Sequence, residues 1–233
     1  MVRAHGERAL LAQAERLDGA APPRVRAGAD EIAAAVDGLD PQVRRALEEM
    51  IVRVRKGSEA QVPPPARTEV APGAVIEQRW VPVDRVGLYV PGGKAVYPSS
   101  VVMNVVPAQV AGVQSIAIAS PPQADHGGRI HPTILAAAGL LGVDEVYAMG
   151  GAGAIGALAH GVDGIGLEPV DVITGPGNVW VAAAKRAVQS VVGIDAEAGP
   201  TEIAIIADDT AHVEYVAAGL VGQAEHDELA GAV

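Results

Sequence analysis

The chain of 233 residues contains no cysteine and no phenylalanine, and only 3% of its residues are aromatic. The absence of cysteine excludes disulfides and thiolate zinc sites. Because aromatic rings are so scarce, the core must be built from Ala, Val, Ile and Leu, whose small side chains let helices lie close to a sheet. No apolar run approaches the ~20 residues that a membrane-spanning helix needs, and the N-terminus lacks a signal-peptide core. We therefore expect a cytoplasmic protein with no membrane partner.

Positive charge is also in short supply, since 17 Lys and Arg residues face 28 Asp and Glu residues. The net charge is −11 and no basic stripe stands out along the chain. Nucleic-acid surfaces need such a stripe, so we expect no nucleic-acid partner. The acidity favours a cationic small-molecule substrate over an anionic one.

Two segments are apolar almost without interruption. Ser115–Ala119 and Glu202–Ala207 are too uniformly apolar for strands with one solvated face, so we expect both to be covered on both faces, as in a parallel sheet. Predicted helices (99–111, 132–141, 152–160, 178–190 and 211–227) alternate with predicted strands (85–90, 115–119, 145–147, 171–174 and 202–207). Helices of this length between strands indicate right-handed crossover connections. The expected fold class is therefore α/β.

The first third of the chain has a different pattern. Helices are predicted up to Leu17, from Asp30 to Val36 and from Asp40 onward, where the aspartates can cap the helix N-termini. A proline-rich connector, Pro63–Pro65, ends this helical part. Extended structure is expected from Thr68 to Val90.

A glycine-rich turn follows the predicted strand at 145–147. Gly151–Gly156 has the Gly-x-Gly-x-x-Gly spacing of a dinucleotide-binding turn, in which glycines let the backbone approach a pyrophosphate at a helix N-terminus. The same spacing occurs where a helix packs tightly on a sheet. Both interpretations stay open from the sequence.

A second turn, Gly175–Asn178, joins a predicted strand to a predicted helix. Asn178 can cap that helix with its side-chain oxygen. Alternatively, its side chain can face a ligand at the carboxyl edge of the sheet, where open α/β folds bind small molecules. The pattern alone favours the cap.

Gln223 and His226 lie three residues apart in the last predicted helix, so they share one helix face. Imidazole is a common zinc ligand, and an amide oxygen is an unusual but workable one. Two ligands do not complete a zinc site, and polar residues near a helix end are more often simply solvated. Neither alternative is settled by spacing.

Several motifs together carry a family resemblance that runs from about Arg79 to the end of the chain. In order, they are Val86–Gly93, Tyr97–Ser100, Met103–Asn104, Gly175–Asn178, Ala183–Arg186, Gly193–Asp195, Ala198–Glu202 and Gln223–Asp227. In this order and near this spacing they resemble the histidinol dehydrogenases. The helical first third is compatible with that family but less diagnostic.

The resemblance implies an enzyme that oxidises L-histidinol to L-histidine through an enzyme-held aldehyde, using two NAD, as the last step of histidine biosynthesis. It implies a homodimer and a zinc ion that orients the substrate. Carried over by position, Tyr89 and Asn178 match NAD-contacting residues, and Thr201 matches a substrate contact. Gln223 and His226 match two zinc ligands that also border the substrate.

The chain departs from the family pattern in two ways. Gly153 stands where the family has a glutamine that contacts NAD, so this substitution removes a cofactor contact. The family's catalytic Glu-His pair, an aspartate and a histidine that complete the zinc site, and a tail that completes the partner subunit's site match nothing here. No catalytic residue is therefore assigned. We expect a fragment that lacks the C-terminal part and the N-terminal arm and has little turnover alone.

The resemblance also implies a division into two Rossmann-like parallel-sheet lobes, arranged as in aldehyde dehydrogenases. One lobe is expected at 89–201 and should bind NAD. The other is expected from 1–88 together with 202–233, with N-terminal helices, and is incomplete. The alternative to an enzyme is a non-catalytic α/β module that binds NAD or another ligand.

Overall fold

The computed structural model describes residues 1–92, 95–197, 199, 201–226 and 228–233. Part of the motif Val86–Gly93 and part of the motif Ala198–Glu202 therefore lie outside the described residues. Asp227, the expected last residue of the final helix, lies outside them as well.

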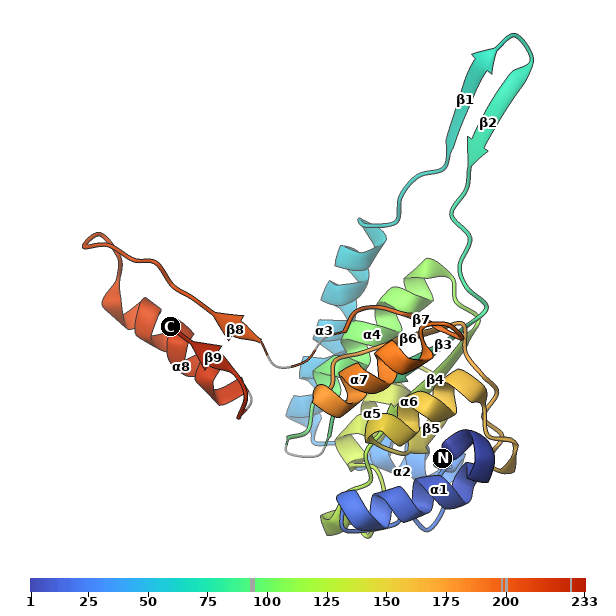
Figure 1. The fold of residues 1–233 in the computed structure, drawn as a ribbon, viewed down its shortest axis with the longest axis vertical. Coiled ribbons are helices and arrows are strands. Elements are labelled where there is room, and N and C mark those ends of the chain that lie inside the picture. The colour runs from blue at the N-terminus through green and yellow to red at the C-terminus, as the bar shows by residue number, and fades with distance from the viewer. Residues whose placement is uncertain (93–94, 198, 200, 227) are drawn as a thin grey trace.

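A parallel sheet of five strands forms the centre of the molecule, in the order β5-β4-β3-β6-β7 (Figure 1). The strands are β3 (Arg85–Tyr89), β4 (Ser115–Ser120), β5 (Val146–Ala148), β6 (Val172–Thr174) and β7 (Gly193–Ile194). In the central register, Leu88 of β3 lies between Ile118 of β4 and Thr174 of β6. The expected α/β class with a parallel sheet is confirmed.

Helices cover both faces of this sheet. They are α4 (Pro98–Ala111), α5 (Pro132–Leu140), α6 (Gly151–His160) and α7 (Val179–Val188), with short 3₁₀ turns at Ala124–His126 and Asp163–Ile165. Side chains of α4 and α5 pack with Leu88 and Ile118 in one core cluster. Side chains of α6 and α7 pack with Ala117 and Ala119 in a second cluster. Alternate residues of β4 thus point into opposite cores, as expected for a strand buried on both faces.

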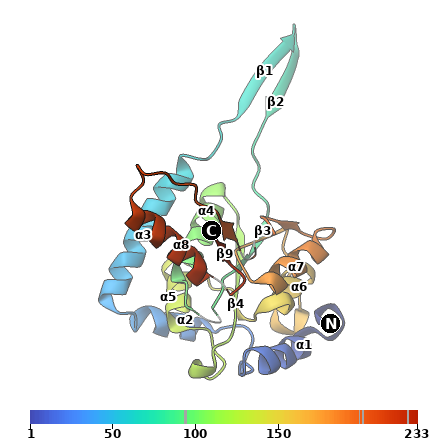
Figure 2. The same cartoon turned by 60° about the vertical axis from the view of Figure 1, so that its left-hand side comes forward.

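Three N-terminal helices form an outer layer over these covering helices (Figure 2). The first, α1 (Val2–Leu17), packs on α6; α2 (Ala29–Asp37) packs on α5; and α3 (Pro41–Glu59) packs on α4. At Gly139 of α5, a Cβ would come within 2.9 Å of the Ile32 side chain, so α2 and α5 approach closely because a glycine lies between them. The family resemblance implied that residues 1–88, which include these helices, belong to the incomplete lobe and not to the lobe at 89–201. That division of the chain remains a prediction.

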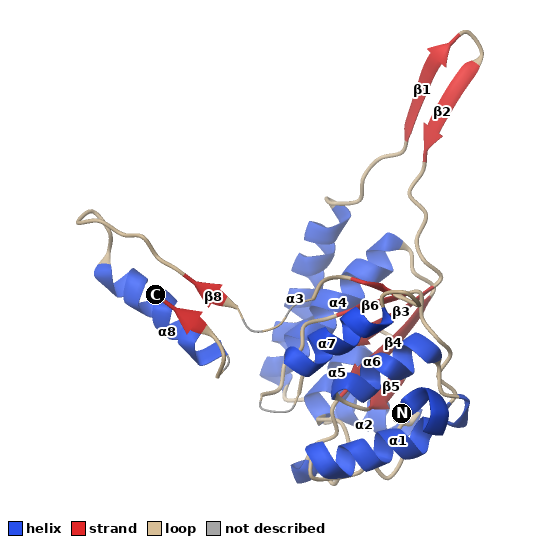
Figure 3. Cartoon of the chain, in the orientation of Figure 1, coloured by secondary structure: helices blue, strands red, loops and turns tan. Residues whose placement is uncertain are grey.

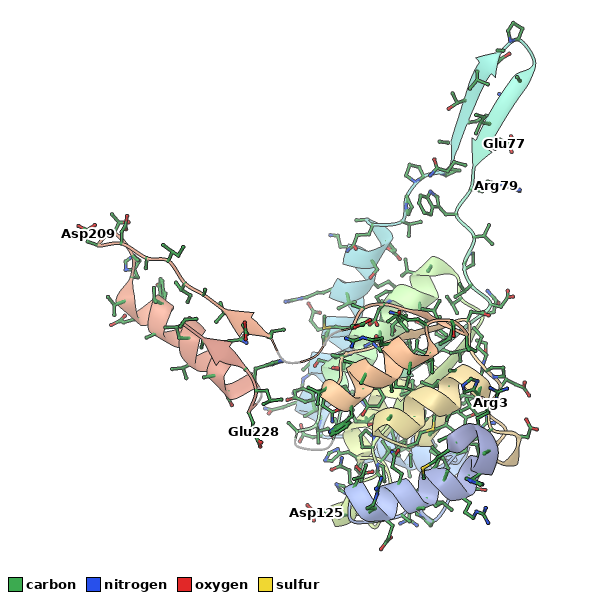
Figure 4. The ribbon with its side chains drawn as sticks, in the orientation of Figure 1. Arg3, Glu77, Arg79, Asp125, Asp209 and Glu228 are labelled. Atoms are coloured by element: carbon green, nitrogen blue, oxygen red, sulfur yellow. The ribbon has the colours of Figure 1, made fainter. Side chains whose placement is uncertain are left out.

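An antiparallel hairpin projects from this body (Figure 3). It consists of β1 (Ala66–Ala71) and β2 (Ala74–Gln78), joined at Gly73, and every residue of both strands is exposed. Figure 4 places Glu77 on this hairpin and Arg79 on the stem that leads back to the body. The expected extended structure between Thr68 and Val90 is therefore present, as a hairpin followed by the central strand.

The C-terminal segment forms a small separate unit. Strands β8 (Glu202–Ile203) and β9 (Gly231–Ala232) pair in parallel, and α8 (Val213–His226) packs against both. Figure 1 shows this unit to one side of the sheet body. The expectation of a long strand over Glu202–Ala207, covered on both faces, is wrong. Ile206 is fully exposed, because α8 covers one side of this segment and no described element covers the other.

Candidate functional site

Strands β3 and β6 are neighbours in the sheet, but the chain leaves them toward opposite faces. The segment after β3 leads into α4, and the segment after β6 leads into α7. Side chains of α4 and α7 belong to the two core clusters on opposite faces of the sheet. This arrangement is a topological switch point, and the carboxyl ends of such strands are where open α/β sheets bind ligands. The two strand ends define the candidate site.

The turn after β6 lies directly against the end of β3. Gly175 has a φ of +113°, and a Cβ at this position would overlap the carbonyl oxygen of Tyr89. Gly177, two residues later, leaves no room for a Cβ beside Val181 of α7. Only glycine satisfies the backbone angle and the close approach at Gly175. The Gly-Pro-Gly sequence therefore exists to bring the start of α7 close to the centre of the sheet.

Hydrogen bonds tie this turn to its surroundings. The Gly175 N–H donates to Asp195 Oδ2 (2.8 Å), and the Gly175 carbonyl accepts from Lys185 Nζ (2.6 Å). On the other side, Thr174 Oγ1 donates to Asn104 Oδ1 of α4 (2.8 Å). The two helices that flank the switch point are therefore both linked to the end of β6.

Asn178 is the N-cap of α7. Its side-chain oxygen accepts from the N–H groups of Trp180 (3.1 Å) and Val181 (3.2 Å), which would otherwise lack intrahelical partners. The capping interpretation of this residue is confirmed. Its predicted contact with NAD is not tested by this geometry and stays a prediction.

Tyr89 ends β3 and is only 4% exposed. Its hydroxyl oxygen accepts from the Gly151 N–H at the start of α6 (3.1 Å). Burial raises the pKa of the Tyr89 phenol above its ordinary value. Tyr89 thus connects the central strand to the glycine-rich turn, and its predicted NAD contact stays a prediction.

The glycine-rich turn itself is closely packed by α1. A Cβ on Gly153 would lie 2.6 Å from Gln13 Oε1, and Gln13 Nε2 donates to the Gly150 carbonyl (2.8 Å). The turn follows β5, which is an edge strand rather than a strand at the switch point. Gly153 therefore lies against the end of a flexible side chain of α1, and the dinucleotide-binding interpretation of this turn stays a prediction.

The family model for histidinol dehydrogenase matches residues 1–233, the whole chain. This chain belongs to the histidinol dehydrogenase family. It is 69% identical to the histidinol dehydrogenase of Leifsonia xyli subsp. xyli over 232 residues, which cover 100% of the chain and 53% of that protein. It is 60% identical to the Thermobifida fusca enzyme, again over 100% of the chain and 52% of the relative. The chain thus spans about half the length of the curated relatives that it matches.

A solved structure agrees with this assignment. The crystal structure of histidinol dehydrogenase from Elizabethkingia anophelis superimposes with a TM-score of 0.89 at 36% sequence identity, covering 98% of this chain and 52% of the other. The family is one of oxidoreductases, so the sheet body described above is part of an enzyme fold.

The remaining residues expected from the histidinol dehydrogenase pattern lie in the C-terminal unit. Gln223 Nε2 of α8 donates to the Thr201 carbonyl oxygen (2.6 Å) and to Thr201 Oγ1 (3.0 Å), so these two residues are in contact. His226 lies one helical turn further along α8 and is exposed. Figure 1 shows the unit that contains α8 standing apart from the sheet body. The structure therefore brings Thr201 and Gln223 together but does not bring them to Tyr89 and Asn178.

The described residues of this chain do not complete a zinc site. Within them, no cluster of three or more His, Cys, Asp or Glu side chains could hold a metal ion. Gln223 and His226 are two possible ligands, whereas protein zinc sites use three or four.

Among the described helices, none combines the length and the apolar composition that a membrane crossing requires.

Three residues of the site escaped sequence reasoning, namely Asn104, Lys185 and Asp195. Each belongs to a motif that carried the family resemblance, but nothing in its local pattern indicated a contact with the switch point. Their partners lie 70, 10 and 20 residues away along the chain. Only the sheet order places them together.

Proposed function

We propose that this chain is a part of a histidinol dehydrogenase that contains its NAD-binding lobe, and that the enzyme oxidises L-histidinol to L-histidine with two NAD in the last step of histidine biosynthesis. The family match over the whole chain is the observation that carries the proposal. The five-stranded parallel sheet with its glycine turn at the switch point supports it, because this architecture binds dinucleotides.

NAD, when bound, accepts the hydride that leaves the substrate carbon. In the proposed site, residues 89–201 form the NAD-binding lobe, with Tyr89 and Asn178 as contacts. The chain's own contribution is to fix the end of β3 against the turn after β6, so that Asn178 and the positive end of the α7 dipole face the ligand. Residues 1–88 and 202–233 belong to the other lobe in this proposal.

The substrate side of the site is assigned to the C-terminal unit. Thr201, Gln223 and His226 would contact L-histidinol, and Gln223 and His226 would be two of the zinc ligands. The further ligands and the acid–base pair would come from a part of the family that has no counterpart in residues 1–233. Without a positioned base the alcohol proton has no acceptor, which costs about 10²–10⁴-fold in rate. The working enzyme would be a cytoplasmic homodimer without a nucleic-acid partner.

Complementation in trans tests this proposal. The chain is purified and mixed with the part of the Leifsonia xyli enzyme that this chain does not match, and NADH formation is followed with and without L-histidinol. We expect little NADH from either piece alone and histidinol-dependent NADH from the mixture. Chelation of zinc should abolish it.

The control is the same mixture with an Asn178→Ala chain, which should need more NAD for the same rate. If the mixture forms no NADH although each piece is folded by circular dichroism, the proposed reaction is rejected. If the chain binds NAD in a fluorescence titration but never supports turnover, the protein is a cofactor-binding module instead.

A further inference from the structure

Lys185 combines full burial with a charge. Its side chain is only 1% exposed, and among the described residues it is the one charged side chain in the buried core. Burying an ammonium group is costly unless the group is both paired and hydrogen-bonded. A leucine or methionine at this position of α7 would fill the same space without that cost. The charge therefore needs an explanation beyond packing.

The partners of Lys185 meet at one glycine. Its Nζ lies 2.6 Å from Asp195 Oδ1 and 2.6 Å from the Gly175 carbonyl oxygen. The other carboxylate oxygen of Asp195 accepts from the Gly175 N–H at 2.8 Å. Lysine and aspartate thus hold both the carbonyl and the N–H of a single residue, and they are joined to each other.

Three elements are tied together by this arrangement. Lys185 lies in the second half of α7, Gly175 follows β6, and Asp195 follows β7. Asp195 is itself anchored, because its N–H donates to the Ile173 carbonyl of β6 (3.2 Å) and its Oδ1 accepts from the Ala196 N–H (2.7 Å). The glycine is held at a φ of +113°, against the carbonyl group of Tyr89.

We propose that Lys185 and Asp195 are positioning residues for NAD: they clamp Gly175 and thereby fix the turn that carries Asn178 and the capped N-terminus of α7. This inference rests on the proposed NAD site. The lysine is buried and its ammonium group bonds to the Gly175 carbonyl and to Asp195, so it acts on the turn and not on the ligand. Its effect on the cofactor passes through the backbone of Gly175.

The test separates positioning from stability with two variants and a control, all made in the full 233-residue chain. Lys185→Met removes the ammonium group and leaves the Asp195 carboxylate. The double variant Lys185→Met, Asp195→Asn removes both charges, so it should recover most of the lost stability. Val188→Ala, a truncation of another buried residue of α7, serves as the control for loss of packing alone.

Two quantities are measured for each chain. The first is NAD affinity by isothermal titration calorimetry. The second is hydrogen exchange at the N–H groups of Gly175, Trp180 and Val181, of which the last two are held by the Asn178 cap. We expect about 10-fold or weaker NAD binding and faster exchange at these amides in both lysine variants, since an unheld carbonyl no longer fixes the turn. The control should keep its affinity and its exchange pattern.

Each outcome decides a different question. If the double variant regains both stability and wild-type NAD affinity, the pair only stabilises the fold and the inference is overturned. If Val188→Ala loses affinity as strongly as Lys185→Met, the inference is also overturned. If the wild-type chain does not bind NAD, the proposed cofactor site is rejected, and unchanged exchange in Lys185→Met would then reject the clamp as well. Faster local exchange in that case would support a clamp that fixes the turn alone.

Discussion

The backbone of Gly175 lies against the carbonyl group of Tyr89, with no space between them for a β-carbon. This contact joins the end of β6 to the end of β3 in the middle of the parallel sheet. It also places the start of α7, and with it the Asn178 cap, at the switch point. The geometry of the whole candidate site depends on this one close approach.

Gly175→Ala should therefore destabilise the sheet body. The added methyl group overlaps the Tyr89 carbonyl and the φ of +113° is unfavourable for alanine, which together should cost about 1–3 kcal/mol or more in the free energy of unfolding. Urea denaturation followed by far-ultraviolet circular dichroism measures it. The matched control is Gly57→Ala, since Gly57 lies in α3 with open space around it. This change should raise the free energy of unfolding by up to about 1 kcal/mol. Equal effects at the two glycines would contradict the expected role of the turn.

Gly153 and Gln13 should behave as a coupled pair. Gly153→Ala places a methyl group 2.6 Å from Gln13 Oε1 and should loosen α1 from α6, whereas Gln13→Ala removes the obstacle together with its bond to Gly150. A double-mutant cycle in urea should give an interaction free energy of about 0.5–3 kcal/mol, because the two changes relieve each other. Strict additivity of the two single changes would show that Gln13 does not set the space at Gly153.

Asn178 offers a way to separate capping from cofactor binding. Asn178→Ala removes the acceptor for the Trp180 and Val181 N–H groups and should destabilise the chain by about 1 kcal/mol. Asn178→Asp keeps a capping oxygen and should retain stability, but its negative charge faces the proposed pyrophosphate site and should weaken NAD binding. Stability is measured by thermal denaturation and affinity by calorimetry. Full NAD affinity in the aspartate variant would argue against a cofactor contact at this residue.

The ion pair of Arg85 and Glu145, at the amino ends of the strands, should govern stability in acid. Burial acts to raise the pKa of the Glu145 carboxyl, but hydrogen bonds and charge from Arg85 outweigh it and leave this pKa below its ordinary value. The carboxylate thus contributes stability above about pH 4.3, and this contribution is lost as the pH falls through the lowered folded-state pKa. Glu145→Gln should cost about 1–3 kcal/mol near pH 7 and progressively less toward about pH 3.

The control for this pH series is Glu49→Gln, which breaks the exposed Arg53–Glu49 pair of α3. Exposed pairs contribute little because water and salt screen them, so its effect should be small at every pH. A constant difference between wild type and Glu145→Gln across the series would rule out the assigned ionisation.

Local sequence pattern was sufficient wherever chemistry within a few residues decides the element. The strand at Ser115–Ala119 and the helix that Asn178 caps both form where expected, because apolar periodicity and cap chemistry act over a few residues. The α/β class followed from the same alternation. Motif resemblance, in turn, was sufficient to identify the family that the comparison confirms.

The local sequence pattern did not predict contacts between elements that are far apart in the chain. The clamp on Gly175 depends on β6 and β7 being adjacent, and the packing of α2 on α5 depends on a glycine more than a hundred residues away. The prediction of a buried strand at Glu202–Ala207 was wrong for a related reason, because an apolar run forms a buried strand only where other elements cover it. Sequence pattern reports what a segment can bury, and the tertiary structure decides what is buried.

The projecting hairpin and the small C-terminal unit have a thermodynamic consequence. A lone two-stranded hairpin is marginally stable in water, and its residues share no core with the sheet body. Heating should therefore melt these outlying parts at a lower temperature than the body, and the van't Hoff enthalpy from scanning calorimetry should fall short of the calorimetric enthalpy. A midpoint read from one spectroscopic probe then describes only the part of the molecule in which that probe resides.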